Sequence, residues 1–170
     1  MDEVIKQKDW TDEELRAAGF HYYEHKRQVT MARVLPASEA PLEMKFAYET
    51  LVVEAGYIIC YQPGDIVYPN INDYDHWPVR PDIFADAYRA WDERGWLPTA
   101  PQRHLILHGC KPYYKYTGVW ARKLSRPTYV LTLESSEPTL IPEGAWLGIG
   151  SMGGPYSMDE PTFLDRYIID

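Results

Sequence analysis

The sequence predicts an α+β protein of mainly antiparallel β-structure, built from two related β-units that are each closed by a short helix. Runs rich in β-branched and aromatic residues recur along the 170 residues, as is typical of β-strands. Short segments of the first half resemble segments of the second half in the same order, which indicates an internal repeat. Each series ends in a stretch whose apolar residues follow helical spacing.

The internal repeat keeps its order and nearly constant spacing. The matching segments are Tyr22-Tyr23 with Tyr113-Tyr114, MARVL (31–35) with WARKL (120–124), and Phe84 with Phe163. Between the last two matches the first copy carries additional residues, within 62–76. The pattern predicts a duplicated β-unit.

The expected elements take the same order in both units. A helix at 12–18 comes first, because Thr11 and Glu14 stand at capping-box spacing and Gly19 can end it. Each unit then continues with a Tyr-Tyr strand, a turn, an Ala-Arg strand, two further strands and a closing helix. The further strands are expected at 42–46, 52–61, 129–133 and 145–149, and the closing helices from Pro81 to Trp91 and from Asp159.

This order divides the chain into four parts. They are an N-terminal helical segment (1–18), a first β-unit (19–91) with an inserted loop (62–76), a connector (92–108) and a second β-unit (109–170). Prolines mark the connector as loop, within which residues 104–108 are expected to add a strand. Because each unit has one apolar sheet face, the two faces are expected to bury each other in one compact body.

Composition and charge narrow the classes of function. Lys and Arg number 17 against 25 Asp and Glu, and the net charge of −8 argues against nucleic acid and anionic membranes as partners. No stretch reaches the ~18 apolar residues of a membrane span, and the N-terminus lacks a signal-peptide pattern. Two cysteines make no disulfide framework. We therefore expect a cytoplasmic protein without a cofactor.

The residues AGYIICY (55–61) and HWPVRPDIFADAY (76–88) resemble a small β-domain of phage and bacterial proteins, whose pattern runs GDYIV, YPVKPDIF and TY. The resemblance covers residues 31–88 well and 120–167 weakly. In this chain Gly56-Tyr57-Ile58 lacks the acidic residue of the pattern. The resemblance implies the β-unit and a non-enzymatic function, since no catalytic residues are assigned in that family.

The expected function is that of a soluble, non-catalytic binding or adaptor protein with a protein partner. The inserted loop carries part of this expectation, because loops on a scaffold often carry function. The segment 111–126, interpreted as a strand pair, carries the rest, since its aromatic residues alternate with basic residues. The binding residues expected from these two features are Trp77, Tyr114, Lys115 and Trp120.

Arg33 and Arg122 recur at matching positions, each on an otherwise apolar strand face. A guanidinium there needs a carboxylate or another anion. One interpretation is a pair of internal salt bridges, with Glu54, Glu143, Asp86 or Asp165 as partners. The other is a small anionic ligand held by both arginines.

The alternative function is a small-ligand or metal-dependent enzyme with a site between the two units. Asp75 and His76 would be its acid/base pair, beside Arg33 and Arg122. His104, His108 and Cys110 form a weaker candidate metal site, because a strand places both histidines on one face.

HYYEH (21–25) reads H-x-x-E-H, a zinc-protease pattern that requires a helix. Gly19 favours a strand after it, so the sequence predicts a polar strand end at these residues.

Overall fold

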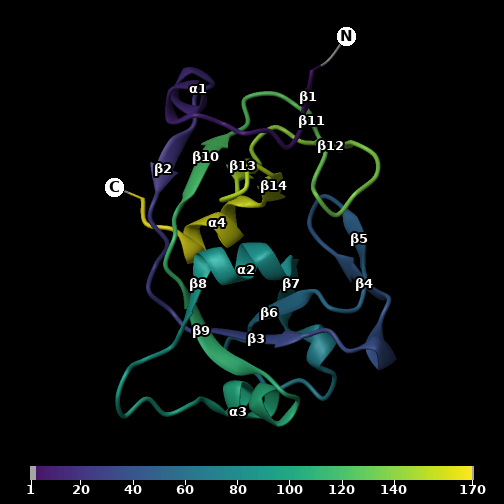
Figure 1. Ribbon diagram of the computed structural model, residues 1–170, viewed down its shortest axis with the longest axis vertical. Coiled ribbons are helices and arrows are strands. Elements are labelled where there is room, and N and C mark those ends of the chain that lie inside the picture. Colours follow the sequence, from purple (N-terminus) through teal and green to yellow (C-terminus); the bar gives the residue numbers. More distant parts are fainter. Residues whose placement is uncertain (1–2, 170) are drawn as a thin grey trace. The chain divides into compact units, whose positions relative to one another are not determined.

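The computed structural model describes residues 3–169 and has the predicted fold class of mainly antiparallel sheets with short α-helices (Figure 1). The chain divides into two compact units, each assembled from separated stretches. Unit 1 consists of the residues up to Lys26, of Glu43–Val52 and of the residues from Thr117 onward. Unit 2 consists of Arg27–Leu42 and Val53–Tyr116.

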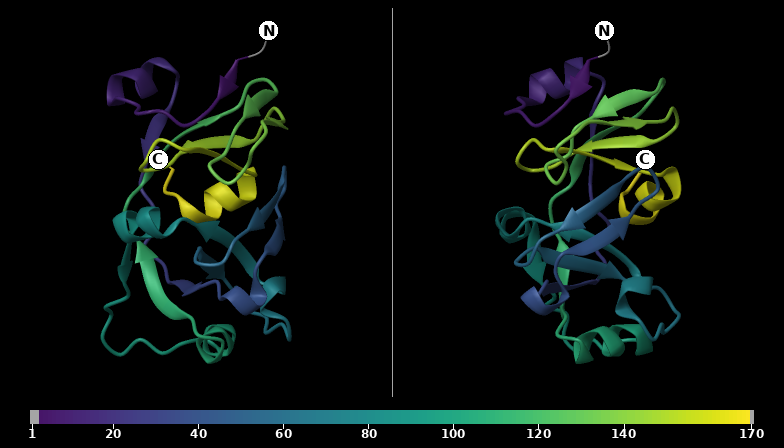
Figure 2. Two further views of the ribbon diagram at one scale, coloured as in Figure 1. Left: turned by 45° about the vertical axis from the view of Figure 1, so that its right-hand side comes forward. Right: turned by 90° about the vertical axis from the view of Figure 1, so that its right-hand side faces the viewer.

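Unit 1 is built on a four-stranded antiparallel sheet in the order β14-β13-β10-β2. Its strands are β2 (His21–Tyr23), β10 (Val119–Lys123), β13 (Trp146–Ile149) and β14 (Pro155–Met158). Helices α1 (Asp12–Ala17) and α4 (Glu160–Arg166) lie on opposite faces of this sheet (Figure 2). The predicted capping box of Thr11 and Glu14 starts α1, and the Asp159 side chain caps α4.

Two smaller sheets complete unit 1. Strand β1 (Val4–Ile5) pairs in parallel with β11 (Thr128–Val130), which pairs antiparallel with β12 (Thr139–Ile141). Strands β4 (Leu42–Lys45) and β5 (Thr50–Val53) form a hairpin, of which residues 43–52 belong to unit 1.

Alternation along the strands divides the apolar residues of unit 1 between the two faces of its sheet. Trp120 packs on the α1 side, against a buried cluster that contains Phe20. Val119 belongs to the cluster on the α4 side. There the ring of Phe163 stacks on Trp146, with centroids 4.0 Å apart and an interplanar angle of 5°.

Unit 2 is built on a five-stranded antiparallel sheet in the order β7-β6-β3-β9-β8. Its strands are β3 (Thr30–Val34), β6 (Ile58–Gln62), β7 (Asp75–Val79), β8 (Tyr88–Ala90) and β9 (Lys111–Lys115). Its helices are α2 (Pro81–Ala87), α3 (Ala100–Leu107) and the 3₁₀ turns η1 (Ala37–Glu39) and η2 (Ile71–Asp73). One buried cluster of this unit consists of Ala32, Cys60, Ala87 and Tyr88.

The two Tyr-Tyr strands are exchanged between the sheets. Strand β2 precedes β3 in the chain but pairs with β10, and β9 precedes β10 but pairs with β3. The expected strand pair at 111–126 is therefore wrong, because β9 and β10 lie in different sheets. For the same reason the compact units do not follow the sequential division 19–91 and 109–170.

Both halves of the chain show one order of elements. A helix, a run of strands and a closing helix extend from α1 to α2 and again from α3 to α4. The duplication itself stays a prediction.

Three local expectations are wrong. The single strand expected at 52–61 is two strands of different sheets, with β5 ending at Val53 and β6 beginning at Ile58, because a turn at 55–56 with Gly56 at a φ of +94° interrupts it. Residues 104–107 end α3 instead of forming a strand, because Thr99 and Gln102 form a capping box and Pro101 stands in the first turn. The closing helix of the first copy stops at Ala87, and residues 88–90 form β8 because the edge of β9 offers them backbone partners.

Candidate functional site

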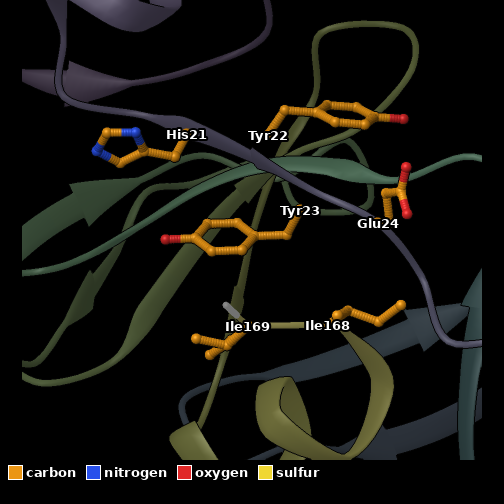
Figure 3. Close-up of a pocket in the computed structure, with 6 residues that line it drawn as sticks. All are labelled: His21, Tyr22, Tyr23, Glu24, Ile168 and Ile169. Atoms are coloured by element: carbon orange, nitrogen blue, oxygen red, sulfur yellow. The ribbon is translucent and has the colours of Figure 1, made fainter.

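A groove lies beside β2, the last strand of the unit 1 sheet. It has a volume of about 610 Å³ and opens to solvent. Its lining consists of His21, Tyr22, Tyr23, Glu24, Ile168 and Ile169. Figure 3 shows the rings of Tyr22 and Tyr23 on opposite sides of β2, with Ile168 and Ile169 on the facing segment.

The facing segment follows α4 and pairs with the chain just beyond β2. Ile168 N–H donates to Glu24 O at 2.9 Å, and Lys26 N–H donates to Arg166 O at 2.8 Å. Between these two bonds His25 and Tyr167 form an isolated antiparallel bridge. Because backbone groups alternate along a strand, the N–H and C=O of Tyr22 point to the same side as the C=O of Glu24. A strand lying in the groove can therefore pair with the backbone of β2 on the same side on which Ile168 pairs with Glu24.

The corresponding place in unit 2 is filled. There β8 follows α2 and pairs with β9 over three residues, Tyr88 with Lys115, Arg89 with Tyr114 and Ala90 with Tyr113. Strand β9 thus has a neighbour on each side, β3 and β8. In unit 1 the segment after α4 makes a single bridge, from Tyr167 to His25, which lies beyond the end of β2. The unit 1 sheet is therefore one strand short along residues 21–23.

The lining of the groove is mixed, and three partly exposed side chains give it apolar surface. Tyr22 is 52% exposed, and Ile168 and Ile169 are each 45% exposed. The Tyr22 ring lies edge-on to Trp120 with centroids 5.7 Å apart, and its hydroxyl accepts a hydrogen bond from Gly118 N–H at 2.8 Å. Tyr22 is thus held in place although its ring is exposed.

The first four residues of the H-x-x-E-H pattern line this groove, but within the described part of the chain the pattern does not form a zinc site. His21 belongs to β2, and the backbone continues extended to His25. In a strand, residues four apart are separated by roughly 13 Å, whereas on a helix they are neighbours. His25 instead contacts Lys26 O through Nδ1 at 2.7 Å and packs edge-on against Tyr167.

Arg33 is held inside unit 2 by a carboxylate that is none of the four expected ones. Its Nη1 and Nη2 donate to Oε2 and Oε1 of Glu39 at 2.8 and 2.5 Å, and its Nε donates to the Tyr61 hydroxyl at 3.2 Å. These bonds raise the pKa of Arg33 and lower that of Glu39. Glu54, Glu143, Asp86 and Asp165 are all exposed.

Arg122 lies in unit 1 and has different surroundings. Its Nη1 donates to Ala18 O at 2.8 Å, and its guanidinium carbon lies 4.9 Å from the centroid of the Phe20 ring. No carboxylate bonds to it among the described residues. The two recurring arginines thus belong to different units and have different partners.

The residues predicted from the inserted loop lie on β7. Asp75 is exposed, whereas the half-buried His76 stacks on Tyr61 and donates from Nδ1 to Tyr74 O at 2.7 Å. Neighbouring strand residues point to opposite faces, so Asp75 and His76 do not form the proposed acid/base pair. Trp77 packs against the buried cluster of Ala32, Cys60, Ala87 and Tyr88.

The other predicted binding residues are divided between the units. Tyr114 and Lys115 lie on β9 and Trp120 on β10. Tyr114 is already engaged, because the Arg27 guanidinium lies 4.3 Å from its ring centroid and Trp91 packs edge-on against it. These residues therefore belong to two different sheets, and not to the strand pair on which the expected basic aromatic surface depended.

The candidate metal ligands lie at the end of α3. The rings of His104 and His108 are 4.9 Å apart. Tyr74 accepts from Tyr68 N–H at 3.1 Å and its hydroxyl contacts His104 Nδ1 at 2.7 Å, which occupies one ring nitrogen. Burial raises the pKa of the Cys110 thiol to about 12, so it is not a thiolate. Within residues 3–169 no group of three or more His, Cys, Asp or Glu could hold a metal ion.

Sequence reasoning missed the groove, because its two sides come from the two ends of the chain. His21 and Glu24 were noticed only as part of a zinc pattern, and no local signal marks Ile168 or Ile169. The predicted repeat is the one signal in the sequence that points to the groove. It makes the segment after α4 comparable with the segment after α2, which forms a strand.

Over the described part of the chain, no helix is both long enough and apolar enough to span a membrane. Comparisons with models of protein families, with curated proteins and with solved structures find no match to this chain. The resemblance of residues 31–88 to the phage and bacterial β-domain therefore stays a prediction.

Proposed function

We propose that this is a binding protein that holds an extended peptide segment of a protein partner as an additional strand beside β2. One observation carries the proposal: β2 is the last strand of its sheet and lies beside a groove of about 610 Å³, while the segment after α4 pairs only with the residues beyond β2. Strand addition uses the hydrogen-bonding groups of such an edge for affinity and neighbouring pockets for specificity.

The groove also offers an apolar contact for a side chain of the bound peptide. Tyr22 and Ile169 are exposed on its two sides. A peptide strand presents alternate side chains to the two faces of the sheet. An apolar residue of the peptide would therefore cover these side chains, while its neighbours would point to solvent.

The distribution of charge between the two units favours a partner segment that is basic. Most of the net charge of −8 belongs to unit 1, where acidic residues outnumber basic ones almost two to one, while the two kinds nearly balance in unit 2. A negative unit attracts cationic segments and repels acidic ones. We also place the protein in a reducing, cytoplasmic setting, because neither buried cysteine forms a disulfide within residues 3–169.

The test uses two amide-capped hexapeptides of alternating residues, lysine-valine and glutamate-valine, titrated by NMR. We expect the lysine peptide to bind at least tenfold more tightly and to protect the Tyr22 amide from hydrogen exchange. A lysine peptide with N-methylated valines should lose binding, because it lacks the backbone donors. Equal binding of the methylated peptide, or an unprotected Tyr22 amide, would overturn the proposal.

Two matched variants separate the groove from general hydrophobic contact. Ile169→Lys places a charge in the groove, and Leu107→Lys places one on α3, where Leu107 is 85% exposed. The first should abolish lysine-peptide binding and the second should leave it unchanged. Equal effects of the two substitutions would contradict the proposed site.

A further inference from the structure

Arg122 presents an unsatisfied hydrogen-bonding edge on the α1 side of the unit 1 sheet. Its Nη1 is bonded to Ala18 O at 2.8 Å. Its Nε is buried and has no partner among the described residues. A guanidinium carries five N–H donors in a rigid fork, and leaving a buried donor of this kind unpaired is unfavourable.

The Nε and Nη2 atoms of Arg122 form the same edge through which another arginine of this protein binds a carboxylate. Arg80 holds Asp82 through Nε at 2.8 Å and Nη2 at 2.9 Å. Arg33 holds Glu39 through its two Nη atoms, and its Nε reaches Tyr61. In Arg122 the bond from Nη1 leaves the Nε and Nη2 edge, which fits two oxygens of one group.

Other charges act on Arg122, and no carboxylate within residues 3–169 bonds to it. Burial lowers the pKa of Arg122, the charge of Arg126 lowers it further, and the exposed Glu3 acts in the opposite direction without a hydrogen bond. Arg16 lies over the Trp120 ring at 5.4 Å, and Trp120 shares the strand face of Arg122. Like charges disfavour one another, and a nearby anion favours the charged form of each.

We propose that Arg122 is the anchor of an oxyanion-binding site, in which Nε and Nη2 hold a carboxylate or phosphate group of a ligand. The Ala18 carbonyl fixes the guanidinium plane, and the Phe20 ring supports its flat side at 4.9 Å. The positive charge of Arg126 also acts at Arg122. The site is independent of strand addition at β2, since it uses side chains on the α1 face and no backbone group of the groove.

The test follows the side-chain Nε–H resonance of Arg122 in the unmodified protein during titration with inorganic phosphate or with acetate. We expect a saturable shift of this resonance with at least one of them. Tighter binding of phosphate assigns a phosphorylated ligand, and tighter binding of acetate assigns a carboxylate. An Arg122 resonance that neither anion moves would overturn the proposal.

Variants provide the second measurement, by calorimetry with the tighter anion. Arg122→Lys keeps the charge but removes the fork and should weaken binding at least tenfold, while Arg80→Lys should leave it unchanged. Undiminished binding by a folded Arg122→Lys protein would overturn the assignment. Binding by Glu3→Gln protein but not by the unmodified protein would also overturn it, because Glu3 would then be the natural occupant.

Discussion

Arg33 and Glu39 form a two-point hydrogen-bonded pair, with Nη1 to Oε2 at 2.8 Å and Nη2 to Oε1 at 2.5 Å. The Arg33 side chain is 7% exposed, so its charge depends on this carboxylate. Glu39→Gln should therefore lower the free energy of unfolding by about 2 kcal/mol, the scale for a buried charged donor that loses its partner. Urea denaturation at pH 7 measures this.

The matched control is Glu93→Gln, since the pair of Glu93 with Arg27 has both side chains about half exposed. That substitution should leave the free energy of unfolding nearly unchanged, because solvent screens an exposed ion pair. The bonds from Arg33 lower the pKa of Glu39. The contribution of Glu39 is thus complete above the ordinary glutamate pKa and is lost as pH falls through the lowered folded value. Unfolding curves of Glu39→Gln and unmodified protein that fail to converge in acid would contradict the assignment.

Glu49 should show the opposite pH dependence. Burial raises its pKa, and the nearby charge of Glu134 raises it further, against a hydrogen bond from Thr139. The folded protein then binds a proton at Glu49 more readily than the unfolded chain, so stability falls as pH rises past the ordinary glutamate value. Glu49→Gln should be more stable than the unmodified protein at pH 7, and the difference should vanish near pH 3.

The control for Glu49 is Glu43→Gln, an exposed position on the same hairpin. Urea denaturation of this variant should match the unmodified protein at both pH values. A Glu49→Gln protein that is less stable at pH 7 would show that the carboxylate is a net stabilising group.

Neither cysteine should react in the folded protein. Cys60 is 0% and Cys110 is 3% exposed, and burial raises the pKa of Cys110 to about 12 against the opposing charge of Arg33. The thiolate is the reactive species, so Ellman's reagent at pH 8 should label both thiols only after guanidinium is added. A Ser125→Cys variant, at an exposed position, should react at once. Fast labelling of Cys110 without denaturant would reveal an opening of unit 2.

Alanine substitutions at two glycines allow the cost of backbone strain to be measured separately from the cost of a steric collision. Gly153 and Gly144 have φ of +81° and +89°. A Cβ at Gly153 would collide with the Lys8 carbonyl oxygen, whereas a Cβ at Gly144 has no atom within 4 Å. Gly144→Ala should cost about 1 kcal/mol through φ alone, and Gly153→Ala at least about 1 kcal/mol more. Equal thermal stability of the two variants would show that the β1 side of unit 1 adjusts freely.

The parts of the fold that local chemistry determines were predictable from the sequence. The caps of α1 and α4 depend on Thr11 and Asp159, whose side chains bond backbone groups three residues away. Strand pairing depends on residues that are far apart in the sequence. Gly118 favours the wrong pairing. It resembles a hairpin glycine after Tyr116, but a Cβ there would collide with Tyr23 O, so its smallness admits β2 beside β10.

The candidate sites were predictable only in part. The recurrence of Arg33 and Arg122 singled out two arginines that are indeed enclosed. Their partners could not be found, because Glu39 reaches Arg33 from the η1 turn and Ala18 reaches Arg122 from the end of α1. Neither contact leaves a periodic signal. The groove at β2 likewise depends on the register of Tyr167 opposite His25.

The exchange of β2 and β9 has a consequence for biosynthesis and for fragment design. A chain that emerges from its N-terminus has every segment of unit 2 once residue 116 is made. Residues 3–26 must wait for β10, β13 and β14, so their long-range contacts form last and close the largest loop. A cut at any single position between the two halves leaves β2 or β9 without its partner strand. Isolated units therefore require circular permutation or deletion at the four crossings, after residues 26, 42, 52 and 116.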